Sequence, residues 1–263
     1  MLNESMATIY TQIDKNTRRP WLIMGLFLIL VIAIGWVFSQ IYANPAILYG
    51  AVIFSFLMNF ASYWYSDKLV IAMSRAKPVE KKDAPELYRI VENLSITAGL
   101  PMPKIYIMNE RALNAFATGR NPEHAVVAVT RGLLERLDKN ELEGVIAHEL
   151  SHIGNRDMLV STVAVVLVGF IAMLSDIFLR FSMFHGGGRD RDGKAGNILM
   201  LFGIALAILA PFIALLMRLA ISRRRELLAD SAGVLLTRYP DGLISALQKI
   251  SADPSKLSVA NHA

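Results

Sequence analysis

Long apolar runs, separated by polar segments, dominate the pattern of this chain. Four runs carry no charged side chain and are long enough to cross a bilayer, which takes about 20 apolar residues in a helix. They are Trp21–Phe38, Ala46–Tyr65, Met158–Ser175 and Ala195–Met217. The pattern predicts two transmembrane hairpins, at 21–66 and 158–221. The first run is too long for the apolar core of a typical signal peptide, so we expect a retained anchor.

The polar remainder falls into a short N-terminal segment, 1–20, and two larger segments, 67–157 and 222–263. Apolar spacing predicts an amphipathic helix over Asp83–Ala98, with Asp83 as its N-cap and Gly99 as its stop. The runs Lys104–Met108 and Ala125–Thr130 are typical of strands, and Asn114–Gly119 of a further strand or turn. We therefore expect a small sheet flanked by helices.

The chemistry of the chain is concentrated in the run His148-Glu149-Leu150-Ser151-His152. Two histidines at i and i+4 lie on one face of a helix, so both imidazoles can reach one metal ion. The helix itself is well marked, since Asp138 and Glu141 form a capping-box pattern at its start. Its expected buried face consists of Leu142, Val145, Ile146, Leu150 and Ile153. Two structural core histidines are the alternative, but Glu149 beside them is costly to bury without a partner.

A catalytic zinc takes three protein ligands, so a further carboxylate or histidine is needed. The best candidate is Glu226, which follows the fourth apolar run as His152 precedes the third. An antiparallel pair of spans would bring these two positions to the same face of the membrane. Asp230, one turn beyond Glu226, can accept the N–H of a ligand imidazole. The alternative for both acidic residues is a solvated face paired with Arg223–Arg225.

Composition narrows the classes of protein that fit this pattern. Hydrophobic residues make up 54% and charged residues 19% of the chain, and the mean hydropathy is +0.42, above the usual soluble range. The absence of cysteine excludes a disulfide scaffold and a thiol nucleophile. The net charge of +5 is explained by basic residues flanking the apolar runs, which place both termini and the middle segment in the cytoplasm. We therefore expect no nucleic-acid partner. A transporter is also disfavoured, because the runs contain no charged side chain.

Three segments together resemble the HtpX family of bacterial membrane zinc metalloproteases. They are His148–Asp157, Asn114–Gly119 and Ser222–Asp230, and the resemblance extends over nearly the whole chain. It implies an α+β fold: a mainly helical membrane protein with about four transmembrane helices and a small, zincin-like cytoplasmic protease domain with a short sheet. It also implies one zinc ion per chain, bound by His148, His152 and Glu226, with Glu149 as the general base and acid.

The resemblance further implies where a substrate binds and what it is. Asn114 and Ala115 would line the cleft, and the strand containing Val126, Val127 and Ala128 would be the edge to which an extended substrate adds. The substrates would be misfolded or damaged proteins of the bacterial cytoplasmic membrane, cleaved at its cytoplasmic face during stress. The family usually continues into a Ser/Thr-His-Pro-Pro motif, whereas no proline follows His262, so we assign His262 no catalytic role.

Two other classes of protein would also carry these metal-binding residues. CAAX prenyl proteases share both metal motifs but have more spans and a large intramembrane chamber. A zinc-binding membrane scaffold without hydrolytic activity would keep the metal ligands but would not need Glu149.

Overall fold

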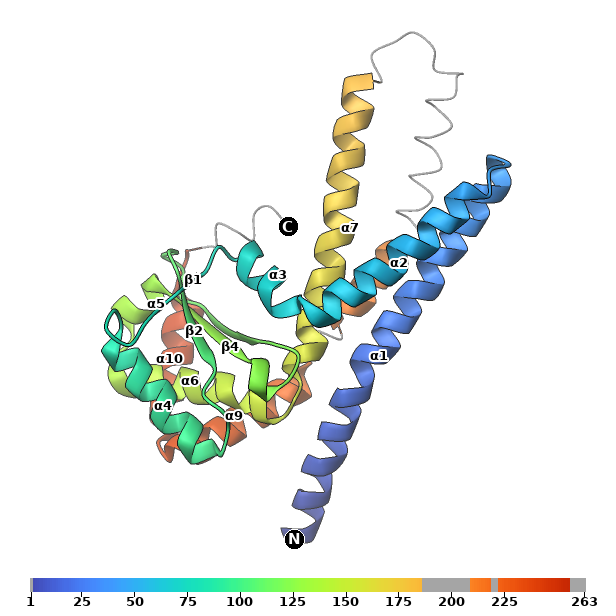
Figure 1. The fold of residues 1–263 in the computed structure, drawn as a ribbon. Helices are drawn as coiled ribbons and strands as arrows, with labels where there is room; N and C mark the ends of the chain where they lie inside the picture. The colour runs from blue at the N-terminus through green and yellow to red at the C-terminus, as the bar shows by residue number, and fades with distance from the viewer. Residues whose placement is uncertain (1, 186–208, 219–221, 256–263) are drawn as a thin grey trace.

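The computed structural model describes residues 2–185, 209–218 and 222–255 of the chain (Figure 1). Helices α1 (Leu2–Ile41) and α2 (Ala46–Trp64) form an antiparallel hairpin that extends away from a compact domain. The short helix α3 (Ser66–Met73) leads from this hairpin into the domain, and α7 (Met158–His185) leaves it again. The segment 209–218 is helical.

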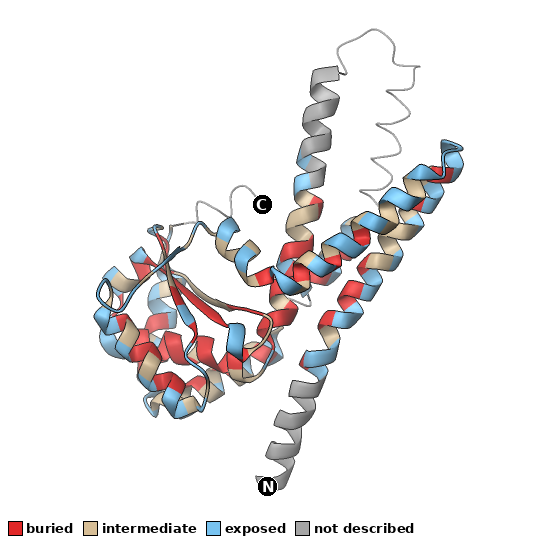
Figure 2. Ribbon diagram, in the orientation of Figure 1, coloured by how far each residue is buried: buried red, intermediate tan, exposed pale blue. Residues whose placement is uncertain are grey.

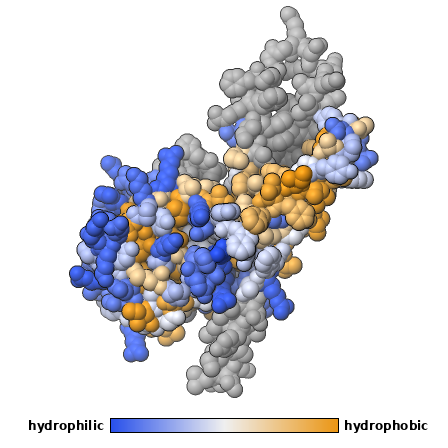
Figure 3. Space-filling model, in the orientation of Figure 1, coloured by the Kyte–Doolittle hydropathy of each residue, from blue (hydrophilic) through white to orange (hydrophobic). Residues whose placement is uncertain are grey.

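Two of the predicted spans are confirmed as helices long and apolar enough to cross a membrane, at Lys15–Ile41 and Ala46–Trp64. The third predicted span lies in α7, which is bent by 89° from the helix before it, so that the pair can count as one broken span. The fourth prediction falls largely on residues 195–208, which lie outside the described residues. Exposed apolar side chains lie along α1 from Trp21 onward and along α2, as expected for surfaces that contact lipid (Figures 2 and 3).

A four-stranded mixed sheet forms one layer of the domain. It consists of β1 (Lys77–Pro78), β2 (Lys104–Met108), β3 (Ala115–Thr118) and β4 (Val126–Thr130), in the order β1-β2-β4-β3. β2 and β4 are parallel, and the two outer pairings are antiparallel. The predicted strand 104–108 is confirmed, the prediction for 125–130 is confirmed to within one residue, and 114–119 contains a strand.

Helices pack around a central helix, α6 (Lys139–Gly154), which contacts strand β3 as well as the helices α4 (Pro85–Ala98), α9 (Arg223–Thr237) and α10 (Pro240–Ala252). A 3-10 turn at Pro122–His124 and the short helix α5 (Arg131–Arg136) precede and follow β4. All five residues predicted for the buried face of α6 are buried, and they join α4 and the sheet in one core (Figure 2).

The predicted start of the amphipathic helix is wrong, although its end is confirmed. Helix α4 begins at Pro85 with Ala84 at the N-cap position, so Asp83 is not the cap. Pro85 provides the start instead, since its fixed φ suits the first helical position and its missing N–H needs no partner there. Gly99 ends the helix in the left-handed conformation, with φ of 66°.

The predicted edge strand is also wrong. β4 lies between β2 and β3, so its backbone groups are paired on both sides. The side chains of Val126, Val127 and Ala128 are buried, with exposures of 3%, 0% and 0%. β4 therefore has no free edge to which a substrate strand could add. The edge of the sheet on this side is β3, which contains Ala115.

The start of α6 is held by Glu141, whose carboxylate makes more contacts than a capping box needs. The predicted box is present: the Asp138 side chain accepts the Glu141 N–H at 2.9 Å, and Glu141 accepts the Asp138 N–H at 2.8 Å. In addition, Ser245 and Lys249 of α10 each donate to the Glu141 carboxylate at 2.6 Å. The Glu141 side chain is only 5% exposed. Through these bonds Glu141 both caps α6 and joins it to α10.

We expect Glu141→Ala to lower the free energy of unfolding by about 2–3 kcal/mol, because a cap and the ion pair with the half-exposed Lys249 are lost together. Thermal or denaturant unfolding in detergent measures it. Glu143→Ala is the matched control, since Glu143 pairs with Lys139 at 3.8 Å on the exposed side of the helix and should change stability by less than about 0.5 kcal/mol. Equal effects of the two substitutions would contradict this account of Glu141.

The free energy of unfolding that Glu141→Ala loses should depend on pH. Burial alone would raise the pKa of Glu141, but the hydrogen bonds from Lys249, Ser245 and the Asp138 N–H outweigh it and hold the pKa below the ordinary 4.5. A carboxylate with a lowered pKa stabilises the folded state above the unfolded pKa, and this stabilisation is lost as the pH falls through the folded pKa. The difference between Glu141→Ala and the unsubstituted protein should therefore shrink below about pH 4.5.

Candidate metal centre

Helix α6 presents three functional side chains close to its C-terminal end. His148 and His152 lie one turn apart on the same face, and Glu149 lies beside the first of them. The opposite face is fixed in the domain core by Ile146, Leu150 and Ile153, all 0% exposed. This packing leaves the histidines little freedom to move, because the helix that carries them is held on one side by the core and at its start by Glu141.

Glu226 reaches this helix from the first turn of α9, which packs closely against α6. Gly233 allows this approach: a Cβ atom there would lie 3.0 Å from the backbone nitrogen of His148, tighter than side chains normally pack. The prediction that Glu226 and His152 lie side by side, despite 74 residues of separation, agrees with the positions in the structure.

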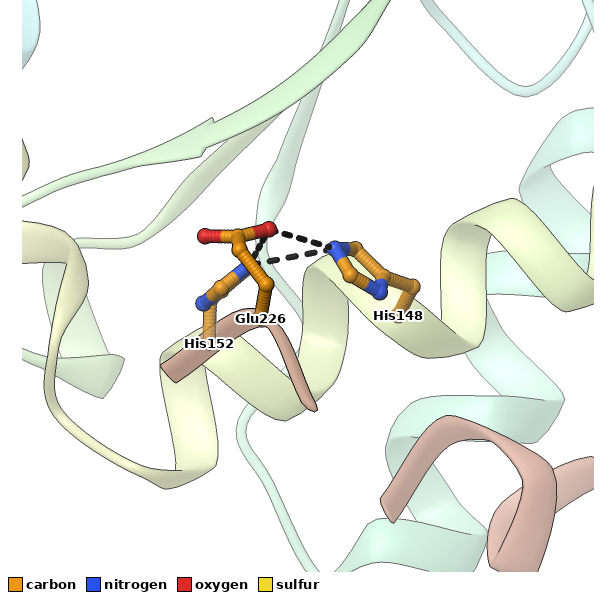
Figure 4. Close-up of side chains that lie close together, drawn as sticks. All are labelled: His148, His152 and Glu226. Atoms are coloured by element: carbon orange, nitrogen blue, oxygen red, sulfur yellow. Dashed lines mark hydrogen bonds and ion pairs between the residues drawn. The ribbon is translucent and has the colours of Figure 1, made fainter. Parts of the chain in front are cut away.

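One nitrogen from each histidine and one carboxylate oxygen converge on a common point (Figure 4). The Nε2 atoms of His148 and His152 are 3.2 Å apart, and Oε2 of Glu226 lies 3.5 Å and 3.8 Å from them. A tetrahedral zinc with bonds of about 2.0–2.2 Å separates its ligand atoms by about 3.3–3.6 Å. The three atoms are therefore spaced as the ligands of such an ion would be, and their nitrogen and oxygen donors suit it chemically.

The other ring nitrogen of each histidine faces a carboxylate. Nδ1 of His152 lies 3.0 Å from Oδ1 of Asp157, within hydrogen-bonding distance, and the Asp157 side chain is 3% exposed. Nδ1 of His148 lies 2.9 Å from Oδ1 of Asp230, an ion-pair distance at an angle unsuited to a hydrogen bond. A carboxylate at Nδ1 favours the tautomer that leaves Nε2 free to bind a metal. Asp230 therefore lies beside a histidine of this site, but the predicted hydrogen bond to the imidazole N–H is not formed.

Asp157 was assigned no role from the sequence, and the structure places it beside His152. It lies three residues past the end of α6, after Arg156, whose φ of 53° turns the chain back toward His152. A short polar turn that brings a carboxylate back to its own helix cannot be read from helical periodicity. Arg225, which is 4% exposed and adjacent to Glu226 in the chain, places positive charge near Asp157 and Glu226.

Glu149 is buried beside the two histidines, with an exposure of 9%. Its burial raises the pKa of the carboxyl group, although the two histidines and a hydrogen bond from the Ala117 backbone partly oppose this. Ala117 belongs to the edge strand β3, so Glu149 interacts with both the two histidines and the edge of the sheet. A carboxylate with raised proton affinity at this position can accept and return a proton.

The electrostatics of the three ligand candidates favour cation binding. Burial would lower the pKa of His152, but Asp157, together with Glu149 and Glu226, outweighs it and raises the pKa to about 9. Burial would also lower the pKa of His148, but Glu226 and Glu149 outweigh it and raise the pKa above its ordinary value. The hydrogen bond with His148 lowers the pKa of Glu226. The carboxylates thus attract positive charge to the point where a metal ion would lie.

We expect Asp157→Asn to weaken metal binding by about 10–100-fold, the usual cost of losing a carboxylate behind a ligand histidine. An amide keeps the shape of the carboxylate but removes the charge facing Nδ1 of His152. Competition with a coloured zinc chelator measures the affinity. Asp241→Asn, in the first turn of α10, is a control of the same chemistry away from the site. An unchanged affinity in Asp157→Asn would mean that Asp157 has only a structural role.

The remaining predicted residues divide into those near this centre and those away from it. Asn114 and Ala115 lie at the start of the edge strand, where the Asn114 carbonyl accepts the Thr130 N–H at 2.9 Å. Val126, Val127 and Ala128 are in the buried strand described above. The other histidines of the chain were not among the predicted site residues. His124 lies elsewhere and bonds with Arg120 and Asn121. The side chains of His185 and His262 lie outside the described residues.

Comparisons with known proteins show what this chain is similar to. Residues 81–262 match the family model described as Peptidase family M48. The chain is 43% identical over 255 residues to a protein named "Protease HtpX homolog" from Dictyoglomus thermophilum, covering 97% of this chain and 83% of that protein. A protein of the same name from Thermococcus sibiricus is 47% identical over 245 residues, covering 92% and 82%.

The fold is also found in a solved structure. The crystal structure of S. mikatae Ste24p aligns with a TM-score of 0.50 at 21% sequence identity. The alignment covers 92% of this chain and 59% of that one. At this level of identity the likeness concerns the fold alone.

Proposed function

The chain belongs to the HtpX family within peptidase family M48 and is a membrane metalloprotease, and from this premise we propose that it is a zinc-dependent endopeptidase. In this proposal His148, His152 and Glu226 bind the zinc ion and Glu149 is the general base and acid. The observation that carries it is the convergence of two Nε2 atoms and one carboxylate oxygen beside a buried glutamate.

The chemistry divides between the ion and the chain. A zinc ion held by these ligands would polarise the scissile carbonyl and make a water molecule more acidic. Glu149 would take the proton from that water and deliver it to the leaving amine. Its burial supports this role, because the raised pKa makes the carboxylate a stronger proton acceptor than an exposed glutamate. Asp157 would keep His152 in the correct tautomer, and Asp230 would place negative charge beside Nδ1 of His148.

The substrate would add to the free edge of β3 rather than to β4. In an antiparallel pair, residues alternate between directing their backbone groups toward the partner strand and away from it. Asn114 bonds with Thr130 of β4, so Ala115 and Ala117 direct theirs away from the sheet. The Ala117 backbone accordingly bonds with Glu149. An extended peptide paired with Ala115 would therefore pass directly beside the proposed base and ligands.

Substrates would be misfolded or damaged membrane proteins, cleaved at the cytoplasmic face of a bacterial inner membrane that this chain crosses several times. Lys15, Arg18 and Arg19 precede the apolar part of α1, and Lys68 and Arg75 follow α2. Basic flanks of this kind favour the cytoplasmic side. The catalytic domain follows α2 through the short helix α3, so it would lie on that side (Figure 1).

The proposal is tested by purifying the chain in detergent and following cleavage of casein, an unfolded substrate, after chelator treatment. We expect cleavage to stop on chelation and to return when zinc is restored. A second arm compares one unfolded segment in free form and fused to a transmembrane anchor in the same nanodisc. Cleavage that is insensitive to chelation would overturn the zinc mechanism. Equal cleavage of free and anchored segments would overturn the preference for membrane proteins.

A further inference from the structure

A cavity of about 320 Å³ lies where helix α2 ends against the catalytic domain. Its walls come from the end of α2, the start of α3, strand β2 and the loop after β3. It is distinct from the metal centre, since none of the metal-ligand candidates lines it. Three basic side chains from three different elements face it: Lys68, Lys104 and Arg120.

The aromatic wall of this cavity is typical of a membrane boundary. Phe60, Trp64 and Tyr65 are 55%, 48% and 47% exposed at the end of a helix that is apolar enough to span. Trp21 of α1 lies at the same level, with its ring centroid 5.1 Å from that of Tyr63. Tryptophan and tyrosine concentrate where acyl chains meet lipid headgroups. The cavity therefore opens at headgroup depth.

Two of the three basic side chains of the cavity lie against aromatic rings, and no carboxylate of the described residues neutralises any of the three. The Arg120 guanidinium lies over the Trp64 ring at 4.7 Å, and its Nη2 lies 2.8 Å from Nε2 of His124. The Lys68 ammonium lies 5.3 Å from the centroid of the Tyr65 ring. Among the described residues, no carboxylate forms an ion pair with any of the three basic groups, although Asp67 also lines the cavity. Such a set of uncompensated donors suits an anion.

The positive surface continues into a second cavity of about 420 Å³. The two cavities share Asp67, Lys68 and Lys104, and the second adds Arg75 and Lys77. On the other side, Phe56 and Leu57 of α2 are exposed and offer an apolar surface. A ligand that fits the whole feature has an anionic head and an apolar tail, which is the chemistry of an anionic phospholipid.

We propose that this cavity binds the phosphate of an anionic phospholipid headgroup, whose acyl chains lie along the exposed face of α2. Arg120 would bind the phosphate oxygens while Trp64 keeps its guanidinium in place, and Lys68 and Lys104 would complete the charge. The lipid would contact α2, α3 and β2 at once. It would thus join the membrane hairpin to the catalytic domain, which are connected here by one short helix.

The test uses the full chain, purified in detergent and freed of lipid, and titrates it with phosphatidylglycerol or phosphatidylcholine. Native mass spectrometry counts the lipids bound to each chain. We expect phosphatidylglycerol to bind at least about tenfold more tightly. Each basic residue near a membrane surface contributes roughly fivefold to affinity, so the double substitution Lys104→Gln/Arg120→Gln should weaken binding about 30-fold. Lys68→Gln alone should weaken it about fivefold.

Lys81→Gln/Lys82→Gln is the matched control, because it removes two positive charges from exposed ion pairs outside the cavity. It should leave lipid binding unchanged, and thermal unfolding without lipid confirms that each variant is folded. Equal affinity for the two lipids, or equal loss in the cavity and control variants, would overturn the proposal. A final arm adds inorganic phosphate. Full displacement of the lipid by millimolar phosphate would show a site for free phosphate and would overturn the lipid assignment.

Discussion

Glu149→Gln should reduce proteolysis by about 10²–10⁴-fold while leaving metal binding unchanged, because it removes only the proton acceptor. Glutamine has the same shape as glutamate and still accepts the hydrogen bond from the Ala117 backbone. It cannot take a proton from water at neutral pH. Stability should not suffer, since burial already disfavours the charged form of Glu149. Casein cleavage measures the activity, and metal analysis of the purified variant measures the zinc content.

The matched control for this substitution is Glu143→Gln on the exposed side of the same helix. It changes the same chemical group without touching the site, so cleavage should continue at the unsubstituted rate. If Glu149→Gln retained full cleavage with its metal in place, Glu149 would not be the general base. If Glu149→Gln lost its metal, Glu149 would be needed to keep the site intact, and the role of proton acceptor alone would be contradicted.

The second large effect is expected for Glu226→Gln, which should weaken metal binding by more than about 100-fold and abolish cleavage. Loss of a carboxylate that only supports a ligand costs about 10–100-fold, so loss of a direct ligand should cost more. Glu226 is also the ligand candidate with a lowered pKa, because His148 hydrogen-bonds to its charged form. An uncharged amide would leave two neutral histidines to hold a divalent cation.

Two further variants separate the direct role of Glu226 from general disruption of the site. Asp230→Asn, one turn further along α9, should weaken binding to the smaller extent expected of a carboxylate behind a ligand. Leu227→Ala changes a side chain that is 66% exposed on the same turn and should change nothing. Stoichiometric metal in Glu226→Gln, measured against a competing chelator, would mean that another group completes the site.

The two histidines of the candidate metal centre were predictable because their placement depends on local patterns. The capping box and apolar stripe define α6, and the i, i+4 spacing places His148 and His152 on one face. Glu226 followed from its position at the end of an apolar run, since an antiparallel hairpin must return to the side where it began. Asp230 then followed from the helical spacing of α9.

The order of the strands was not predictable in the same way. Both β2 and β4 are apolar runs, and an apolar run indicates burial without indicating which neighbours a strand has. β4 has five buried residues, which is the burial expected of a central strand. The edge is formed instead by the less apolar β3, whose four residues lie beside α6. The edge was therefore assigned to the wrong strand.

Asp83 and Asp157 show two limits of local sequence patterns. Asp83 was assigned a role that it does not have, and Asp157 was assigned none although it contacts His152. Asp83 has the right residue type for a cap, but Pro85 starts the helix two residues later. Asp157 lies in a turn that periodicity does not describe, yet it contacts a ligand histidine. In both places the outcome depends on backbone conformation beyond the helix, which single-residue preferences do not specify.

The position of a bound metal tests the central claim most directly. Anomalous diffraction at the zinc absorption edge, on crystals of the protein prepared with zinc, would locate it without reference to activity. We predict one peak per chain, about 2.0–2.2 Å from Nε2 of His148, Nε2 of His152 and a carboxylate oxygen of Glu226. A zinc peak bound by other residues, with these three side chains free of metal, would contradict the account.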